Sequence, residues 1–323
     1  MKTRTIKSDI LLLLTAIIWG FAFVAQRVGM DYIGPFMFNG IRFALGFFSL
    51  IPLVLFTERI ARKKNKAETD IRQDKKQDAK ILLNGGILAG LALFTGASMQ
   101  QIGLVYTTAG NAGFITGLYV VIVPILGLFT KSRPDAGTWI GAVLAAIGLY
   151  LLSVTDNFTI AFGDLLELIG AFFWAGHVII IGVFSPRVNV LKLALIQFAT
   201  CSILSILTGL AIETTTMTGL SNALVPILYG GIGSVGIAYT LQVVAQKHAH
   251  PTHAAIILSL ESLFAAVGGW LFLNEFISMR GMLGCALMLT GMLVSQLHEY
   301  FLYTRKISGK ISSDKTIETE SNP

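Results

Sequence analysis

Charged residues are scarce in this chain of 323 residues. Asp, Glu, Lys and Arg make up only 13% of it, whereas soluble globular domains carry about 25%. No charged residue occurs between positions 81 and 130, and this stretch is long enough for two transmembrane helices of about 20 residues each. The scarcity of charge excludes an ordinary water-soluble domain and predicts a membrane protein.

Cysteine and catalytic motifs are scarce as well. The two cysteines, Cys201 and Cys285, both lie in apolar segments, so the sequence predicts neither disulfides nor a metal site. The sequence also lacks a phosphate-binding Gly-rich loop with Lys and a zinc-binding His-Glu-x-x-His pattern. We therefore predict no cofactor, no nucleotide-driven pump and no enzyme activity.

Apolar residues, by contrast, are abundant. They make up 54% of the chain, and its mean hydropathy is +0.72. Uncharged or nearly uncharged runs predict an all-α integral membrane protein with ten transmembrane helices. The helices of the first half are expected at about 10–27, 35–56, 81–101, 108–130 and 137–155. Those of the second half are expected at about 165–185, 191–212, 222–246, 253–273 and 280–298.

The two halves of the chain repeat each other. Residues of the first half recur in the second half at one constant offset and without a gap. The pairs join Asp9, Ala16, Trp19, Val28, Ile41, Phe43 and Ala44 to Asp164, Ala171, Trp174, Val183, Ile196, Phe198 and Ala199. Because each half holds an odd number of predicted helices, the second half enters the membrane from the opposite face. The sequence therefore predicts two inverted five-helix repeats.

The repeat also predicts the boundaries of the two halves. Residues 1–156 form the first five-helix repeat, with a cytoplasmic loop at 57–80, and residues 157–303 form the second. We expect residues 304–323 to be a disordered cytoplasmic tail. Because the first helix has a counterpart inside the chain, we expect it to be retained rather than cleaved as a signal peptide.

Loop charges predict the orientation in a plasma or inner cell membrane. Lys and Arg accumulate in cytoplasmic loops, and the 57–80 loop is rich in both. Counting alternately from this loop places both termini in the cytoplasm. The net charge of +6 lies mainly in such loops and tails, so it indicates orientation in a lipid bilayer rather than binding of nucleic acid.

Four further features carry a family resemblance. They are Trp19–Gly20, echoed as Trp174–Ala175; Arg42; the segment Leu258–Glu261 leading to Asn274–Glu275; and the run from Gly281 to Gly291. From about residue 8 to 298, the chain resembles the EamA-type transporters of the drug/metabolite transporter superfamily. This resemblance implies ten helices in two inverted halves and favours export of a metabolite. Members usually have Pro after the Glu that corresponds to Glu261, where this chain has Ser262.

Arg42 is the first candidate for a substrate-binding residue. It is expected about 10 Å below the outer surface if its helix starts near Pro35. A charge at this depth is costly unless it snorkels or faces a wet cavity. Two interpretations therefore stay open: contact with an anionic group such as a carboxylate, or extension to the outer headgroups. The repeat counterpart of Arg42 is Gln197, so the two halves would treat a charged ligand unequally.

Glu261 and His177 are the candidates for proton coupling, because each is a titratable residue inside an apolar span. Glu261 could bind and release a proton, hold a substrate amine, or pair structurally with Arg42 or a backbone group. His177 could relay a proton, bond a substrate, or simply bond a neighbouring helix.

Trp19, Tyr119, Trp174 and Gln242 complete the candidate substrate site. The two tryptophans lie too deep for interfacial anchors and form either cavity walls or helix packing. Tyr119 and Gln242, like Gln100 and Tyr239, are polar at depth, and they either contact a ligand or bridge helices.

The sequence thus predicts a secondary transporter that moves a small polar metabolite such as an amino acid by alternating access. The family resemblance implies that it is an exporter. Proton coupling is compatible with this prediction. The alternative is a membrane scaffold or receptor without transport activity.

Overall fold

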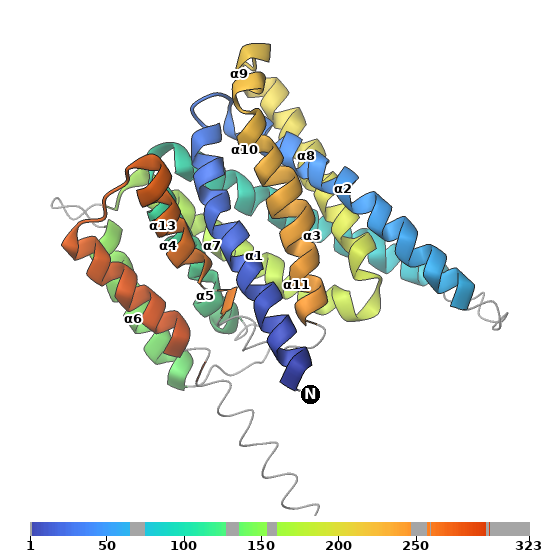
Figure 1. The fold of residues 1–323 in the computed structure, drawn as a ribbon, viewed down its shortest axis with the longest axis horizontal. Coiled ribbons are helices and arrows are strands. Elements are labelled where there is room, and N and C mark those ends of the chain that lie inside the picture. Colours follow the sequence, from blue (N-terminus) through green and yellow to red (C-terminus); the bar gives the residue numbers. More distant parts are fainter. Residues whose placement is uncertain are drawn as a thin grey trace, which may run out of the picture.

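The computed structural model describes residues 2–64, 75–126, 136–153, 160–246, 257–258, 260–294 and 297. These residues form helices and no β-strand (Figure 1). The first half contains α1 (Lys2–Gly29), α2 (Pro35–Lys64), α3 (Lys75–Tyr106), α4 (Ala109–Gly117), α5 (Tyr119–Leu126) and α6 (Ala136–Ser153). The second half contains α7 (Phe162–Phe184), η2 (Ser185–Arg187), α8 (Val190–Ile212), α9 (Met217–Asn222), α10 (Leu224–Leu228), η3 (Tyr229–Ala238), α11 (Tyr239–Gln246), α13 (Glu261–Leu273) and a helix at Met279–Val294.

The prediction of an all-α membrane protein is confirmed. Within the described ranges, six helices are long and apolar enough to cross a membrane: Ile6–Gly29, Pro35–Ile60, Asp78–Tyr106, Phe162–Phe184, Val190–Ile212 and Leu224–Gln242. Four apolar helices are shorter: Ala109–Val123, Ala136–Leu152, Glu261–Leu273 and Met279–Val294. The count of ten spans and the inverted repeats stay predictions.

Several helix bounds differ from those expected. α2 continues to Lys64 and α3 begins at Lys75, because the charged residues beyond the apolar core are themselves good helix formers. The predicted 57–80 loop is therefore partly helical, and the predicted tail at 304–323 lies outside the described residues.

Two predicted helices are interrupted. The helix expected at 108–130 turns at Leu118 between α4 and α5, where Leu118 N–H donates to Ile115 O at 3.1 Å. The helix expected at 222–246 contains the ten-residue π-helix η3. η3 carries four glycines in its sequence YGGIGSVGIA, and glycine disfavours the α-helix. π-helical segments often occur at functional sites.

Helices of the two halves pack against each other. α2 packs on α8, α3 on α7 and α8, and both α1 and α4 on α13. Figure 1 shows α2, α3 and α8 side by side on the right, and α6 at the opposite edge of the bundle. The core of the molecule is therefore built jointly by both halves.

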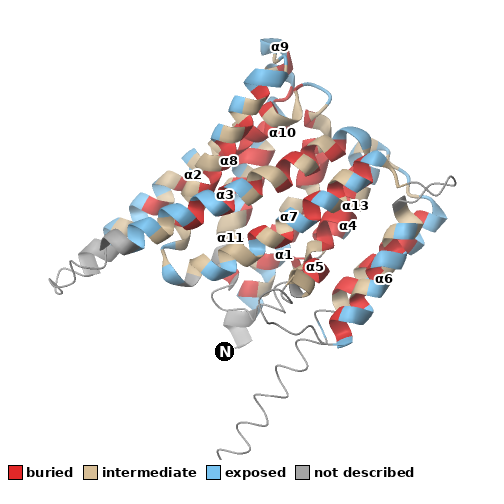
Figure 2. Cartoon of the chain, turned by 180° about the vertical axis from the view of Figure 1, so that it is seen from behind, coloured by how far each residue is buried: buried red, intermediate tan, exposed pale blue. Residues whose placement is uncertain are grey.

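The outward faces of the helices are apolar. Figure 2 shows exposed residues along the outer sides of α2, α8 and α6, and these include Phe48, Leu207 and Val143. An apolar surface of this extent is unfavourable in water and suits the hydrocarbon core of a bilayer.

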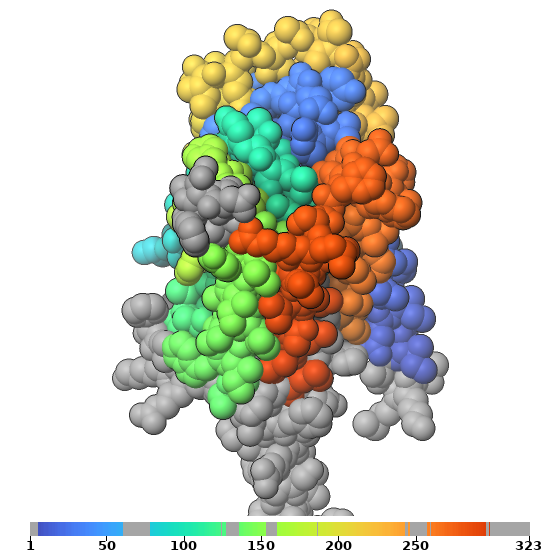
Figure 3. Space-filling view, turned by 90° about the vertical axis from the view of Figure 1, so that its left-hand side faces the viewer, coloured from blue at the N-terminus to red at the C-terminus, as the bar shows by residue number. Residues whose placement is uncertain are grey.

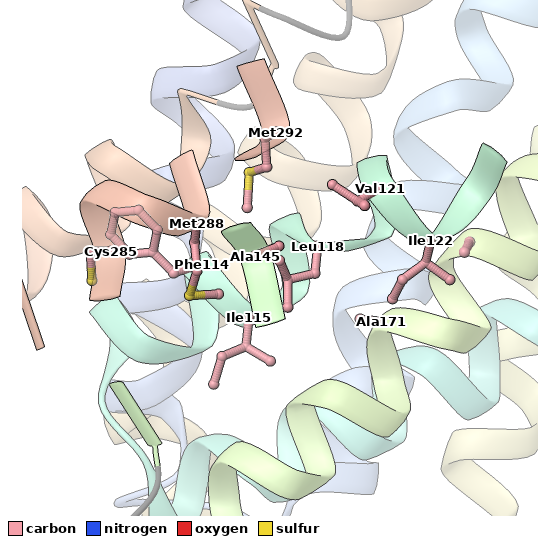
Figure 4. Close-up of a cluster of buried hydrophobic side chains, with 11 residues drawn as sticks. Phe114, Ile115, Leu118, Val121, Ile122, Ala145, Ala171, Cys285, Met288 and Met292 are labelled. Carbon is pink, nitrogen blue, oxygen red and sulfur yellow. The ribbon is translucent and has the colours of Figure 1, made fainter. Parts of the chain in front are cut away.

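α6 and the helix Met279–Val294 approach closely. They lie side by side in Figure 3, and a Cβ atom on Gly148 would lie 2.5 Å from Gly284 O. Glycine at both positions lets the backbones touch, as in small-residue contacts of membrane helices. Figure 4 shows the adjoining cluster, in which Phe114 of α4 packs near Cys285 and Met288.

Candidate functional site

A cavity of about 700 Å³ lies between helices of both halves, and it gathers every candidate residue that the sequence analysis singled out. Its lining includes Trp19, Arg42, Tyr119, Trp174, His177, Gln242 and Glu261. These residues come from α1, α2, α5, α7, α11 and α13. The volume lies within the range of about 300–1,000 Å³ that is usual for small-molecule sites.

The guanidinium of Arg42 is buried, with only 4% of the residue exposed. Its central carbon lies 4.9 Å from the ring centroid of Phe43 and 5.8 Å from that of Phe38. Nε has no hydrogen-bond partner among the described residues. The side chain therefore packs among aromatic rings beside the cavity, and its Nε–H group is free to donate a hydrogen bond.

A row of aromatic rings connects α1 to α2 along the cavity. The Trp19 and Tyr239 ring centroids lie 5.0 Å apart, those of Tyr239 and Phe198 lie 5.5 Å apart, and those of Phe198 and Phe43 lie 6.0 Å apart. Trp19 Nε1 donates to Ser234 O in η3 at 3.2 Å. These contacts fix the wall of the cavity next to Arg42.

Trp174 belongs to a chain of side-chain amides. Its Nε1 donates to Gln100 Oε1 at 2.9 Å, and Gln100 Nε2 donates to Gln26 Oε1 at 3.2 Å. The chain of hydrogen bonds joins α7, α3 and α1, so Gln100 bridges helices. Gln242, half-buried in α11, makes no hydrogen bond to any residue in the described ranges.

His177 lies next to Gln197 of α8. Its Nε2 is 2.8 Å from Gln197 Oε1, where an Nε2–H group would donate. Its ring packs edge to face on Trp174, with centroids 6.0 Å apart. Gln197 thus connects His177 to α8, and it is also the repeat counterpart of Arg42.

Glu261 occupies a different place in its helix than the sequence analysis expected. The predicted helix began at 253, which put Glu261 well inside it, whereas α13 begins at Glu261 itself; residues 253–256 and 259 lie outside the described ranges. Glu261 is buried, with 5% exposed, and it makes no hydrogen bond or ion pair with any described residue. A carboxylate there is stabilised by the positive end of the helix dipole.

Tyr119 is the first residue of α5, directly after the turn at Leu118. The interruption between α4 and α5 therefore places a polar side chain on the cavity wall. Thr116, one turn earlier in α4, lines the cavity as well.

The sequence analysis missed several polar residues of this region, among them Gln26, Thr116 and Glu167. Gln26 and Thr116 line the cavity, and uncharged polar residues are too common in membrane helices to be singled out. Glu167 of α7 is fully buried behind Thr116. A charged residue within a predicted span is a functional candidate on its own, and this signal was present in the sequence.

At the end of the bundle opposite the N-terminus marked in Figure 1, two carboxylates hold the first turns of helices. Glu213, which follows α8, accepts hydrogen bonds from Phe36 N at 2.8 Å and Met37 N at 2.9 Å. Backbone N–H groups at a helix start have no partner within the helix, so this carboxylate satisfies two of them in α2.

Glu275 does the same for α4. It accepts hydrogen bonds from Ala109 N at 2.8 Å and Gly110 N at 3.2 Å. Asn274 ends α13 with a left-handed backbone (φ 53°), a conformation that asparagine tolerates and that turns the chain toward α4. The Asn274–Glu275 pair thus acts as a helix stop followed by a cap for another helix.

The EamA-like transporter family model matches residues 6–154 and again residues 161–296. The chain belongs to this family. The family resemblance predicted from the sequence is therefore confirmed.

Relatives of this EamA protein are named as transporters. An uncharacterized transporter of Archaeoglobus fulgidus is 31% identical, and the match covers 91% of this chain and 87% of the relative. The uncharacterized transporter YoaV of Bacillus subtilis is 22% identical over 86% of this chain and 93% of its own length. A probable amino-acid metabolite efflux pump of Escherichia coli is 28% identical over 52% of this chain and 51% of its own length.

A solved crystal structure shares the fold of this EamA protein. It covers 91% of this chain and 98% of its own chain with a TM-score of 0.61 and 19% sequence identity. The family, the relatives and the apolar helices together indicate a multi-pass membrane transporter that acts on small molecules.

Proposed function

We propose that this EamA-family protein is a secondary transporter, working as an exporter, that moves a small polar metabolite such as an amino acid by alternating access. The observation that carries the proposal is the cavity, because it brings together the rare polar and charged groups of an otherwise apolar bundle. The amino-acid class is supported by one relative, a probable amino-acid metabolite efflux pump.

Arg42 is the proposed contact for an anionic group of the solute. A buried guanidinium is costly in a membrane protein unless a partner satisfies it. Its Nε is without a hydrogen-bond partner in the described part of the chain, and a guanidinium binds a carboxylate with two parallel hydrogen bonds. A solute carboxylate would thus supply the missing partner.

Glu261 and the aromatic residues complete the proposed site. Glu261 would face the amino group of a zwitterion or exchange a proton, and Trp19, Trp174 and Tyr119 would enclose the solute. His177 stays a second proton candidate beside Gln197. Gln242 adds an amide that would bond the solute.

Alternating access requires a cavity that opens to one side at a time. The lining of the cavity extends to Ser185 and Val190, where α7 ends and α8 begins. The opposite end is held by the caps from Glu213 and Glu275. We propose an orientation in which both termini are cytoplasmic and residues 1–156 and 157–303 form inverted halves. In this orientation, the proposed opening at Ser185 and Val190 would face the cytoplasm.

The proposal is tested by flux of labelled amino acids, nucleobases and other small metabolites into proteoliposomes. We expect saturable flux of one class, and we expect Arg42→Gln to abolish flux of the solutes that carry a carboxylate. Arg27→Gln is the matched control, because Arg27 is a partly exposed arginine paired with Asp31 at 2.8 Å and does not line the cavity. Equal flux in Arg42→Gln and the unmodified protein would remove the anion role. Folded protein without saturable flux of any solute would favour the scaffold or receptor.

A further inference from the structure

A second buried carboxyl group lies behind the cavity wall, and the proposed transport site does not use it. Glu167 of α7 is 0% exposed. Its Oε2 accepts a hydrogen bond from Thr116 Oγ1 at 3.1 Å, whereas its Oε1 has no hydrogen-bond partner among the described residues. Gly103 of α3 provides the space for this oxygen, since a Cβ atom there would lie 2.8 Å from Oε1.

Among the described residues, no positive charge compensates Glu167. The titratable and charged side chains described on α7 and on the elements packed against it are Asp164 and His177 of α7, Asp78, Lys80 and Tyr106 of α3, Tyr119 of α5 and Arg187 of η2. α4 has none of its own, and Glu275 caps its first turn. Within the described ranges, no ion pair reaches Glu167.

Asp164 is the charged neighbour of Glu167, one helical turn away on α7. It is 1% exposed, and it accepts hydrogen bonds from Thr107 Oγ1 and, at 3.4 Å, from Asn111 Nδ2. Asp164 thus accepts hydrogen bonds from two side chains, whereas Glu167 accepts one. An ionised Glu167 would add a like charge next to it, and like charges at this spacing repel.

The surroundings of Glu167 therefore suit a neutral carboxylic acid. An ionised carboxylate in a low-dielectric interior needs a counter-ion or several donors. The described residues supply only the Thr116 hydroxyl and no counter-ion. A metal cation such as Ca²⁺ needs about six to eight oxygen ligands, whereas the described groups around Glu167 include no cluster of three or more metal-binding side chains. A proton is the cation that this site can hold.

One hydroxyl group connects Glu167 to the cavity. Thr116 lines the cavity and donates to Glu167. Its hydroxyl is able to pass its hydrogen to the carboxylate while it takes a proton from a donor in the cavity, so that Thr116 ends unchanged and Glu167 ends neutral. The reverse transfer returns the proton to the cavity.

We propose that Glu167 is a proton-binding site of the transport cycle, loaded and emptied from the cavity through Thr116. This inference rests on the proposed transport function, and it assigns proton coupling to a residue outside the substrate cavity. Glu261 and His177, which line the cavity, would then contact the solute.

The first test needs no solute and therefore separates this inference from the transport proposal. Infrared spectra of the protein in lipid vesicles are recorded at mildly acidic and mildly alkaline pH. We expect a carbonyl stretch of protonated carboxylic acids, part of which Glu167→Gln removes. Glu275→Gln is the control, because Glu275 accepts two backbone hydrogen bonds as a carboxylate, and it should leave the band unchanged. A spectrum of Glu167→Gln that keeps the whole band would overturn the inference.

The second test measures coupling. In proteoliposomes, a proton gradient should accelerate flux through the unmodified protein, and this acceleration should be lost in Glu167→Gln while exchange of labelled for unlabelled solute persists. Thr116→Val keeps the shape of the side chain but removes the hydroxyl, so we expect it to keep the infrared band and to slow the coupled flux. Glu167→Asp serves as the folded alternative if the glutamine variant does not assemble, and it should retain some acceleration. Acceleration that is unchanged in Glu167→Gln contradicts the inference.

Discussion

At the end of the bundle where α2 begins, Glu213 and Glu275 accept four backbone hydrogen bonds from the first turns of α2 and α4. At the other end, where the cavity lining reaches Ser185 and Val190, the nearby contact between α2 and α8 is an ion pair of Lys192 Nζ with Glu58 Oε1 at 2.5 Å. At one end, the carboxylate of Glu213, directly after α8, bonds to backbone N–H groups of α2. At the other end, two charged side chains of α2 and α8 form an ion pair.

The difference in burial indicates which end is held more firmly. Glu213 is half-buried and bonds to N–H groups that have no partner within their helix, and hydrogen bonds to a charged group stabilise by about 1.5–3 kcal/mol each. The side chains of Lys192 and Glu58 are 42% and 27% exposed, and such surface pairs contribute about 0–1 kcal/mol. The end where α2 begins is thus held by hydrogen bonds to backbone groups. We call it the closed end, because we propose that the cavity opens at the other end.

The largest effect on this contrast is expected from Glu213→Ala. The variant leaves two N–H groups of α2 without their acceptor, and we expect a loss of about 2 kcal/mol in the free energy of unfolding. The Glu213→Ala variant should also make the cavity accessible from the side where α2 begins. A cysteine placed at Ser234 on the cavity wall, with Cys201 and Cys285 replaced by alanine, should then react faster with a membrane-impermeant thiol reagent added on the side where α2 begins.

Glu213→Gln is the control for this experiment, because it keeps one side-chain oxygen as an acceptor. Its labelling rate should fall between those of the alanine variant and the unmodified Glu213. Equal labelling of all three proteins would show that Glu213 does not close the cavity.

A smaller effect is expected from Glu275→Ala. One of its two hydrogen bonds is longer, 3.2 Å to Gly110 N, and α4 is a short helix of nine residues. The same thiol assay should show a gain in labelling that is smaller than for Glu213→Ala. Asn274→Gly is the neighbouring control, since glycine adopts the left-handed conformation readily. A gain in labelling from Asn274→Gly as large as that from Glu275→Ala would assign the closure to the turn rather than to the carboxylate.

The candidate site could be predicted from the sequence because charged residues are rare in the apolar segments of this chain. Arg42 and Glu261 stand out in apolar helices, and the repeat drew attention to Trp19 and Trp174; all four line one cavity. Glu167 carries the same signal, a charge inside the predicted span at 165–185, but the sequence analysis did not single it out.

The closed end could not be predicted from local patterns. Glu213 and Phe36 are 177 positions apart, and Glu275 and Ala109 are 166 apart, so only the packed helices bring them together. The same holds for η3, whose π-helical backbone presents Ser234 O to Trp19. The four glycines indicate that this segment has a low propensity for the α-helix. They do not indicate that a π-helix forms instead.

The smallest effect is expected from Lys192→Met. This variant removes the ion pair with Glu58 at the end where α8 begins and replaces lysine by an uncharged side chain of similar length. Because the pair is partly exposed and screened by salt, we expect the free energy of unfolding to fall by less than about 1 kcal/mol. Labelling of the Ser234 cysteine should be unchanged from either side, because the cavity already reaches this end. Thermal unfolding at low and high ionic strength gives the measurement, and the difference between variant and unmodified protein should shrink as salt rises. A loss as large as that of Glu213→Ala would mean that both ends of α2 are held equally, and it would contradict the contrast between them.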